Sequence, residues 1–298
     1  MANRRVLVKR RKAVRNIRKI TRTMQLIATA RFQAAFNRAV ATKPYTEKLA
    51  ELVADLSRAA GSVDHPLLRS NQESGRSALV VLTSNRGLAG GYNAGVLRTA
   101  VEHLDRQQAA GVATDVHMVG KKGVAYFRFL RRATTEQTVT ISDKPRFEQV
   151  EPIANALMDR FIRGEISSVH VAYMRFVSAG VQRPAVVQLL PLKPETATAA
   201  AGENREGEKG ATAVEYEFSP DPRQLLDELL PATVRVRLFQ AFNDAAVSEQ
   251  VARMVAMKAA TDAAGDMIKS LTREYNRARQ TQITMELLDI VGGANALS

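Results

Sequence analysis

The stretch SNRGLAGGYN, residues 84–93, comes nearest to a nucleotide-binding motif in this sequence. It follows a short apolar run and precedes a predicted helix, which is the order in which dinucleotide-binding folds hold a pyrophosphate. The glycines are spaced Gly87-x-x-Gly90-Gly91, and this matches neither G-x-G-x-x-G nor the G-x-x-x-x-G-K-[ST] loop. The spacing therefore favours a tight turn that packs a helix on a sheet, with a weak anion site as the alternative.

Other residue types that support catalysis are scattered along the chain. Cysteine is absent, which excludes disulfides and thiolate metal sites. Asp143 and Glu148 lie near a proline and indicate only a loop. The histidines form neither an i, i+4 pair nor an H-E-x-x-H motif, so each is expected to be exposed or to belong to the core: His65, His103, His117 and His170. The sequence predicts no catalytic residue, no cofactor and no metal site of its own.

The chain is strongly basic, and this predicts an acidic partner. It has 298 residues, a net charge of +13 and a pI near 10.2. Nucleic acid, anionic lipid or an acidic protein surface would each satisfy that charge. Aromatic residues make up 5% of the chain and tryptophan is absent, which argues against a base-stacking platform. No apolar run reaches 18 residues, so no membrane-spanning segment is predicted.

The middle of the chain alternates between strand and helix patterns. Short apolar runs predict strands at residues 78–83, 115–119, 138–141, 168–175 and 185–190. Helical patterns lie between them, at residues 93–108, 121–130 and 152–163. This alternation is typical of an open, mostly parallel α/β sheet. Residues 193–213 are poor in bulky apolar side chains and are expected to form a mobile loop, after which residues 214–218 alternate like a strand.

The first sixty residues predict a long helix, from about residue 3 to residue 56. They contain no glycine and a single proline, Pro44, and residues 1–46 contain no Asp or Glu. One face of this helix is expected to carry the apolar residues that recur every three or four positions: Ile17, Ile20, Met24 and Ile27.

The end of the chain predicts a second and longer helix. It is expected to begin at Pro231, because proline suits the first helical position, and to stop at Gly292 and Gly293. A helix from Pro231 to Leu288 would span roughly 85 Å and needs a partner along its length. Its predicted seam is weak and rich in small residues: Met257, Ala260, Ala264, Met267, Leu271, Glu274, Ala278, Thr281, Met285 and Leu288.

The simplest partner for this helix is the N-terminal helix, as an antiparallel pair with the α/β domain inserted between them. The predicted domains are residues 1–60 and 221–298, which form the two long helices, and residues 75–218, which form the α/β domain.

Several segments resemble the gamma subunit of F-type ATP synthase. The C-terminal run SEQVARMVAMKAATDAAGDMIKSLTREYNRARQTQITMELLDIVGGA is similar to one signature of that family, and NIRKITRTMQLIATARF is similar to the other. SNRGLAGGYN, VGKKG and ELLP match its middle segments, in the same order. Because the family pattern begins within about the first ten residues, no transit peptide is expected and a bacterial-type protein is implied.

The resemblance implies an α/β protein with a long antiparallel coiled coil of N- and C-terminal helices and an inserted Rossmann-like open α/β domain. It implies the central-stalk rotor of the synthase, which is not an enzyme in isolation. The implied partners are three alpha and three beta subunits, the epsilon subunit and the membrane c-ring, with no nucleic acid. Membrane association would be indirect, as a peripheral protein on the cytoplasmic side of the cell inner membrane.

The resemblance also implies contact residues. Arg253 and Gln280 match positions that hydrogen-bond a beta loop, and Met24 matches a position near the beta lever. Lys121 is implied to lie near the c-ring or epsilon. The apolar bearing at the top of the alpha/beta ring would be formed by the end of the C-terminal helix: Leu287, Leu288, Ile290 and Val291.

Three positions depart from the family pattern. Asn85 stands where Asp is common, and Ala89 stands where Cys is frequent. Gln25 occupies a position where Lys is usual, so the lever contact is weakened or passes to Arg22.

Two other functions remain open from the sequence. A nucleic-acid-binding protein would explain the charge, although no recognition motif supports it. A nucleotide-dependent enzyme would have to be built on the Gly-rich turn at residues 84–93.

Overall fold

The computed structural model describes residues 4–59, 65–69, 74–141, 143–192 and 222–296. The chain forms two compact units. We call residues 1–30 with 253–298 the helical-pair unit, and residues 31–252 the α/β unit. Two long helices, α1 (Arg4–Ala59) and α6 (Pro222–Ala296), contribute residues to both units. Whether residues 1–60, 75–218 and 221–298 fold as separate domains stays a prediction.

Both long helices are present, but the predicted ends of α6 are wrong. The helix begins at Pro222 and contains Pro231, and it continues through Gly292 and Gly293 to Ala296. Leu226 and Leu230 lie before the proline and are fully buried. Burial of two leucines is worth about 3–6 kcal/mol, which exceeds the cost of about 3 kcal/mol for a proline inside a helix. Helix α1 likewise runs through its single proline, Pro44.

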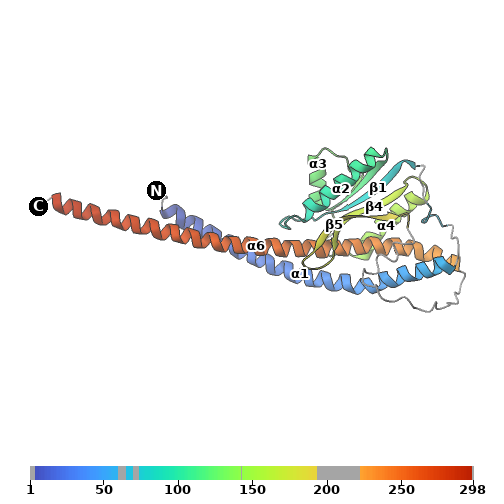
Figure 1. Ribbon diagram of the computed structural model, residues 1–298, viewed down its shortest axis with the longest axis horizontal. Coiled ribbons are helices and arrows are strands. Elements are labelled where there is room, and N and C mark those ends of the chain that lie inside the picture. The colour runs from blue at the N-terminus through green and yellow to red at the C-terminus, as the bar shows by residue number, and fades with distance from the viewer. Residues whose placement is uncertain (1–3, 60–64, 70–73, 142, 193–221, 297–298) are drawn as a thin grey trace. The chain divides into compact units, whose positions relative to one another are not determined.

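The α/β unit contains one five-stranded sheet in the order β3-β2-β1-β4-β5 (Figure 1). Strands β1, β2, β3 and β4 are parallel, whereas β5 pairs with β4 in the antiparallel direction. The strand bounds are β1 Arg76–Leu82, β2 Ala113–Val119, β3 Glu136–Thr138, β4 Ser168–Phe176 and β5 Gln182–Leu190. The predicted open, mostly parallel sheet is confirmed.

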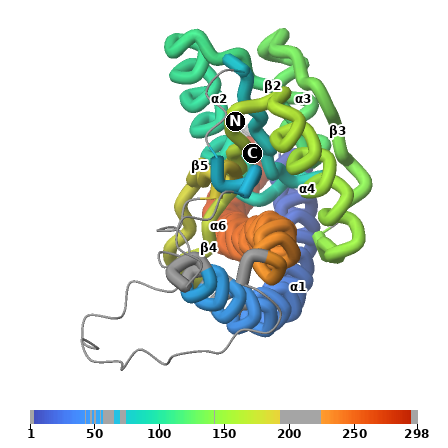
Figure 2. Tube along the Cα trace, turned by 90° about the vertical axis from the view of Figure 1, so that its right-hand side faces the viewer, coloured from blue at the N-terminus to red at the C-terminus, as the bar shows by residue number. Residues whose placement is uncertain are grey.

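Side chains of the central strand β1 pack into two apolar cores, one on each face of the sheet. Leu79 and Val81 pack against α2 (Tyr92–Ala109) and α3 (Lys121–Phe129). Ala78, Val80 and Leu82 pack on the other face, against α4 (Phe147–Ile162), α6 and α1. Figures 1 and 2 show the same layers within this unit. Burial on both faces explains why β1 is a continuous apolar run in the sequence.

Two elements of the α/β unit differ from the prediction. Strand β3 ends at Thr138, and Ile141, which was predicted to lie in this strand, is buried in the core instead. Helix α4 begins at Phe147, five residues before Pro152, because its apolar face already starts at the fully buried Val150. The predicted loop at residues 193–213 and the predicted strand at 214–218 lie outside the described residues.

The helical-pair unit consists of the first part of α1 packed antiparallel against the last part of α6. The hydroxyl oxygens of Thr21 and Thr261 lie 2.8 Å apart, and the Arg11 guanidinium lies 4.9 Å from the centre of the Tyr275 ring. Residue numbers thus rise on one helix as they fall on the other, and the predicted antiparallel pairing is confirmed.

The seam of this pair agrees with the predicted one at Ala264, Leu271 and Ala278, and differs at the positions between them. Ala264 and Leu271 are buried in it against Leu7 and Val14 of α1, and Ile268, Tyr275 and Ala278 pack against them. Four residues of the predicted seam are exposed: Met267, Glu274, Met285 and Leu288. Ile268 and Tyr275 pack in the seam instead of Met267 and Glu274.

The apolar residues predicted for one face of α1 are not its main internal packing surface. Ile17, Ile20 and Ile27 are exposed, and Met24 is half-buried. Small or polar side chains, including Ala28 and Thr21, lie inward in their place. Across the described ranges, no helix is long and apolar enough to cross a membrane.

Candidate functional site

The uncovered surface of the helical-pair unit combines large apolar side chains with cations. Such a surface marks an interaction site, because soluble proteins rarely leave large apolar side chains clustered in water. The exposed apolar residues are Val6, Val8, Ile17, Ile20, Leu26 and Ile27 on α1, and Val255, Met267, Ile283, Met285, Leu287, Leu288, Ile290 and Val291 on α6.

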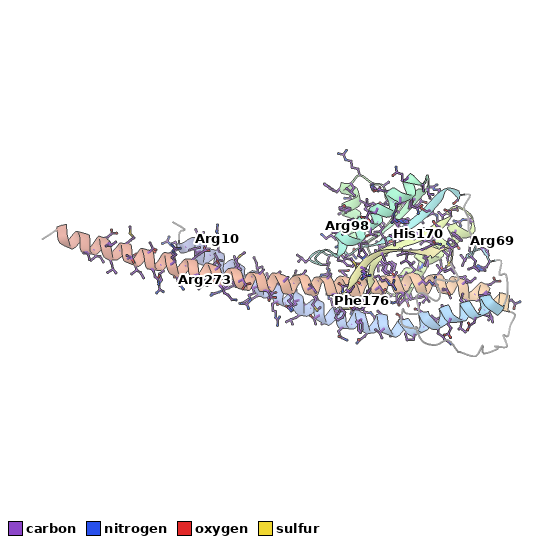
Figure 3. All side chains as sticks on the ribbon, in the orientation of Figure 1. Arg10, Arg69, Arg98, His170, Phe176 and Arg273 are labelled. Atoms are coloured by element: carbon purple, nitrogen blue, oxygen red, sulfur yellow. The ribbon has the colours of Figure 1, made fainter. Side chains whose placement is uncertain are left out.

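The cations of this unit lie mainly on α1. Residues 4–30 contain ten Lys or Arg and no acidic residue, whereas residues 253–296 contain six Lys or Arg and five Asp or Glu. Arg10 and Arg273, labelled in Figure 3, are both exposed. This unit therefore carries most of the chain's net charge of +13, and its charge is complementary to an acidic surface.

The last turns of α6 carry the predicted bearing residues. Every residue from Gln282 to Gly292 is exposed in the described part of the chain. Leu287, Leu288, Ile290 and Val291 are all more than half exposed, and Ile290 reaches 69%. This segment is a helix without an apolar partner of its own, which is the condition in which a helix docks into another surface.

The predicted contact residues of the helical-pair unit do not form a single site. Arg253 is only 7% exposed, Met24 is half-buried and Gln280 is exposed. The pairing of Thr21 with Thr261 puts Met24 on the turn nearer Arg253. Gln280 lies 27 residues from Arg253 along α6, which corresponds to about 40 Å.

The Gly-rich turn at residues 84–93 is held by its own hydrogen bonds. The Asn93 side chain accepts from the Ser84 backbone N–H at 3.0 Å, and its amide donates to the Ser84 hydroxyl at 2.8 Å. The Ser84 hydroxyl in turn donates to the Arg86 carbonyl at 2.6 Å. Gly90 has a φ of +54°, in the left-handed region that favours glycine. These contacts support the tight-turn interpretation.

Lys121 is exposed at the start of α3, and Asn85 caps this helix. The Lys121 backbone N–H donates to the Asn85 Oδ1 at 3.0 Å, and the Asn85 Nδ2 donates to the Ile141 carbonyl at 2.7 Å. An aspartate could not make the second bond, so the amide explains why Asn suits this position in this chain.

The segment VGKKG, residues 119–123, joins β2 to α3 through two glycines that leave no room for a side chain. A Cβ on Gly120 would lie 2.1 Å from the Thr83 carbonyl oxygen, and a Cβ on Gly123 would lie 2.2 Å from the Met118 Sδ. The Thr83 hydroxyl donates to the Val119 carbonyl at 2.7 Å and accepts from the Gly123 N–H at 2.9 Å. Lys121 is therefore held on a rigid element.

The structure brings two of the four histidines together, which the sequence did not predict. The rings of His103 on α2 and His170 on β4 have centroids 4.6 Å apart. Burial lowers the pKa of His103, and the nearby Arg106 lowers it further. His65 and His117 lie elsewhere, and burial lowers the pKa of each, partly offset by Asp227 and Glu136 respectively. No group of three or more metal-ligating side chains occurs within the described ranges.

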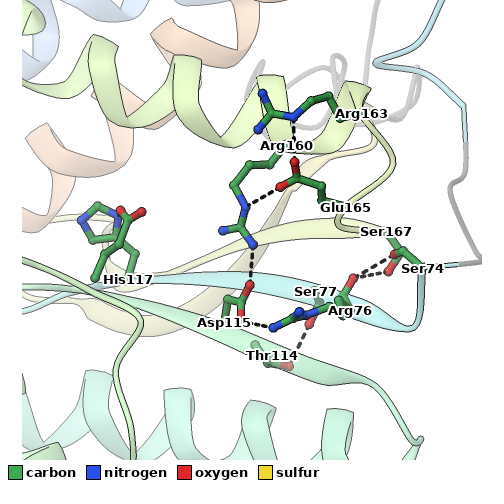
Figure 4. A network of polar contacts seen from close by, with 11 residues as sticks. Ser74, Arg76, Ser77, Thr114, Asp115, His117, Arg160, Arg163, Glu165 and Ser167 are labelled. Atoms are coloured by element: carbon green, nitrogen blue, oxygen red, sulfur yellow. Dashed lines mark hydrogen bonds and ion pairs between the residues drawn. The ribbon is translucent and has the colours of Figure 1, made fainter.

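A polar network at the amino ends of β1 and β2 was also missed (Figure 4). Asp115 accepts from Arg76 at 3.1 Å and from Arg160 of α4, and Arg160 also donates to Glu165 at 3.4 Å. Asp143, which was predicted to lie in a simple loop, pairs with Arg31 of α1 at 2.5 Å. These ion pairs join β1 to β2, α4 to β2, and α1 to the segment before α4, and no periodicity in the sequence could have revealed them.

Comparison with known proteins identifies the family. The family model described as ATP synthase matches residues 3–297. The ATP synthase gamma chain of Rhodopirellula baltica is 45% identical over 302 residues, which cover all of this chain and 99% of the relative. The chain belongs to the ATP synthase gamma chain family. The gamma chain resemblance of the sequence motifs is thereby confirmed over the full length.

Solved structures share the gamma chain fold. A chain of the Euglena gracilis mitochondrial ATP synthase, solved as OSCP/F1/c-ring in rotational state 3, has a TM-score of 0.65 and 18% identity, covering 99% of this chain and 94% of that one. A chain of the rotor of the same synthase in rotational state 1 has a TM-score of 0.60 and 17% identity, covering 94% and 98%. At this identity the likeness concerns the fold alone.

Proposed function

We propose that this chain is the central-stalk rotor subunit of a proton-translocating F-type ATP synthase, which couples rotation of the c-ring to the conformational cycle of the beta-subunit catalytic sites. The observation that carries the proposal is membership of the gamma chain family over essentially the whole length. The partners are three alpha and three beta subunits, the epsilon subunit and the c-ring. Neither the family match nor the relatives support the nucleic-acid-binding alternative.

The surface of the helical-pair unit suits a subunit that turns inside a ring. Its seam is formed by a few side chains such as Leu7, Val14 and Leu271, which hold the two helices together. Its outer surface carries single apolar side chains and long, exposed cations. Each exposed ion pair contributes at most about 1 kcal/mol, so such contacts form and break as the chain turns. Torque would then come from many weak contacts together with the shape of the helices.

The contact residues are part of this proposal. Met24, Arg253 and Gln280 would contact beta subunits, and Lys121 would contact the c-ring or epsilon. The uncovered end of α6 supports a role in the bearing of the alpha/beta ring for four residues: Leu287, Leu288, Ile290 and Val291.

The chain itself would be non-catalytic, since nucleotide sites belong to the alpha and beta subunits in this proposal. It would be a peripheral protein on the cytoplasmic side of the cell inner membrane, held there by the c-ring. Its own contribution is mechanical: the asymmetric helical pair presents a different face to each beta subunit in turn.

Progressive truncation of α6 in the complex tests this proposal. The chain is expressed with all the other subunits of its cognate synthase, including the c-ring, in energised membrane vesicles, and it ends after Thr281 or after Ala260. The cut after Thr281 removes the last turns of α6, whose residues 282–292 are exposed, so the remainder of the free chain should keep its fold. We expect ATP synthesis to fall severalfold with the first cut and to be lost with the second, because the second also removes the seam residue Leu271.

Circular dichroism of each variant and co-purification with alpha and beta serve as controls for folding and assembly. Unchanged assembly and unchanged coupled synthesis after the cut at Ala260 would refute the rotor function.

The variants Arg253→Ala and Gln280→Ala test the proposed beta contacts. Each should lower the rate of ATP synthesis more than it lowers the stability of the free chain. If folded variants synthesised ATP as fast as the unchanged chain, these two residues would be excluded from the proposed contacts.

A further inference from the structure

The outer face of α3 exposes three large apolar side chains side by side. Tyr126, Phe129 and Leu130 are spaced i, i+3 and i+4, which brings them to one face of the helix. All three are exposed, and the Phe129 ring reaches 81%. Helix α3 lies on the outside of the α/β unit together with α2 (Figure 1).

This exposure is not the result of a loosely held helix. The opposite face of α3 is fully buried at Phe127, and Gly123 packs against Met118 and Thr83 without space for a methyl group. The helix is rigid, and it presents Phe129 to solvent on a firm support. Aromatic side chains held in this way are typical anchors of protein interfaces.

The C-terminal end of α3 carries an arginine where the backbone favours glycine. Arg131 has a φ of +55°, and its N–H donates to the Arg128 carbonyl at 3.1 Å. The Arg132 N–H donates to the Phe127 carbonyl at 3.0 Å, so the helix ends in a Schellman motif with Arg131 at the left-handed position. A non-glycine residue is unfavourable there, and such local strain is typical of positions kept for function.

The charge beside this face is positive and unneutralised. The nearby carboxylates are already engaged: Asp105 pairs with Arg132 at 2.6 Å, and Glu136 pairs with His117 at 2.9 Å. Arg128 and Arg131 have no acidic partner within the described part of the chain. An apolar face beside free cations is complementary to an apolar recess beside carboxylates.

We propose that the outer face of α3, formed by Tyr126, Arg128, Phe129, Leu130 and Arg131, docks against an acidic protein surface whose apolar recess accepts the Phe129 ring. A protein is favoured over an anionic membrane because the Phe129 ring is held on a rigid helix, and an aromatic side chain held in this way suits a shaped recess in a protein partner. The docking rests on the proposed function in one respect: the partner is expected to be another subunit of the assembled synthase.

Photo-crosslinking in the assembled synthase tests this docking. Tyr126 is replaced by p-benzoylphenylalanine, the complex is purified and irradiated, and crosslinked peptides are identified by mass spectrometry. We expect a crosslink to a protein segment that contains several carboxylates. Val177, which is 57% exposed in the turn between β4 and β5, provides the control position, and it should not yield the same peptide.

The variant Arg131→Gly separates docking from stability. Glycine suits the left-handed position, so the midpoint of urea unfolding should rise, while the crosslink yield at position 126 should fall at least about threefold because one cation is lost. Arg131→Lys keeps the charge and should retain most of the yield. If Arg131 had only a structural role, Arg131→Gly would change the crosslink yield and the midpoint of urea unfolding in the same direction.

The remaining outcomes also decide the question. Crosslinks only to lipid, to a second copy of the chain or to a segment without carboxylates would overturn the docking, as would the absence of any crosslink in a complex that has assembled. Failure of the chain to co-purify with alpha and beta would instead count against the proposed function, so the two failures are distinguishable.

Discussion

Replacing Leu271 with alanine should open the helical-pair unit, whereas the same change at Met267 should not. Leu271 is 9% exposed and packs with Val14, while Met267 is 54% exposed on the adjacent face. Burying a leucine is worth about 1.5–3 kcal/mol, and truncation to alanine removes most of it, so we expect a loss of about 2 kcal/mol. Alanine has a slightly higher helix propensity than either residue, and this gain is the same for both variants.

Hydrogen exchange of the full-length chain measures this loss locally. Amides of residues 4–14 and 264–278 should exchange roughly thirtyfold faster in Leu271→Ala, because about 1.4 kcal/mol corresponds to a factor of ten. Met267→Ala should change these rates by less than about twofold, since its side chain is mostly in water. Equal acceleration in both variants, or a larger effect at Met267, would show that the seam has the phase predicted from sequence.

Two further predictions concern the α/β unit. Gly123→Ala should destabilise it by about 1–3 kcal/mol, because the new methyl group would lie 2.2 Å from the Met118 Sδ. Gly91→Ala is the control and should be nearly neutral, since its methyl group would meet no atom within 4 Å. Urea unfolding compares the two variants, and equal unfolding midpoints would refute the packing argument. Burial lowers the pKa of His117 despite the opposing charge of Glu136, so the unfolded chain binds the proton more readily than the folded chain. The free energy of unfolding should therefore be highest above about pH 6.5 and should decrease as the pH falls below that value. His117→Asn should flatten this pH dependence of the urea midpoint, and an unchanged slope would contradict the assignment.

The fold was predictable from sequence where burial produces long, regular patterns. The apolar run at residues 78–83 predicted a strand, and it corresponds to β1, the central strand of the sheet, which is buried on both faces. The absence of glycine and the spacing of charges predicted α1 almost to its ends. Proline was the least reliable guide, because packing of Leu226 and Leu230 outweighs the cost of Pro231.

The seam and the candidate surfaces were harder to predict for a physical reason. When alanines and threonines fill an interface, two adjacent faces of the same helix have similar hydrophobicity. Packing against the partner helix then decides which of the two faces is buried. Ile17, Ile20 and Ile27 follow the spacing of one helical face and are exposed, since spacing alone does not distinguish a buried apolar face from an exposed one. The left-handed Arg131 and the ion pairs of Asp115 depend on backbone geometry and distant contacts, which spacing does not reveal.

Single-molecule rotation tests the central claim most directly. The chain has no native cysteine, so one cysteine at the exposed residue Ala179 can carry a bead on the α/β unit while the alpha and beta subunits are fixed to a surface. With ATP, we predict that the bead turns in one direction with three pauses per revolution, one for each beta subunit. A bead that stays still, or that moves at random while the same molecules hydrolyse ATP, would contradict the rotor function.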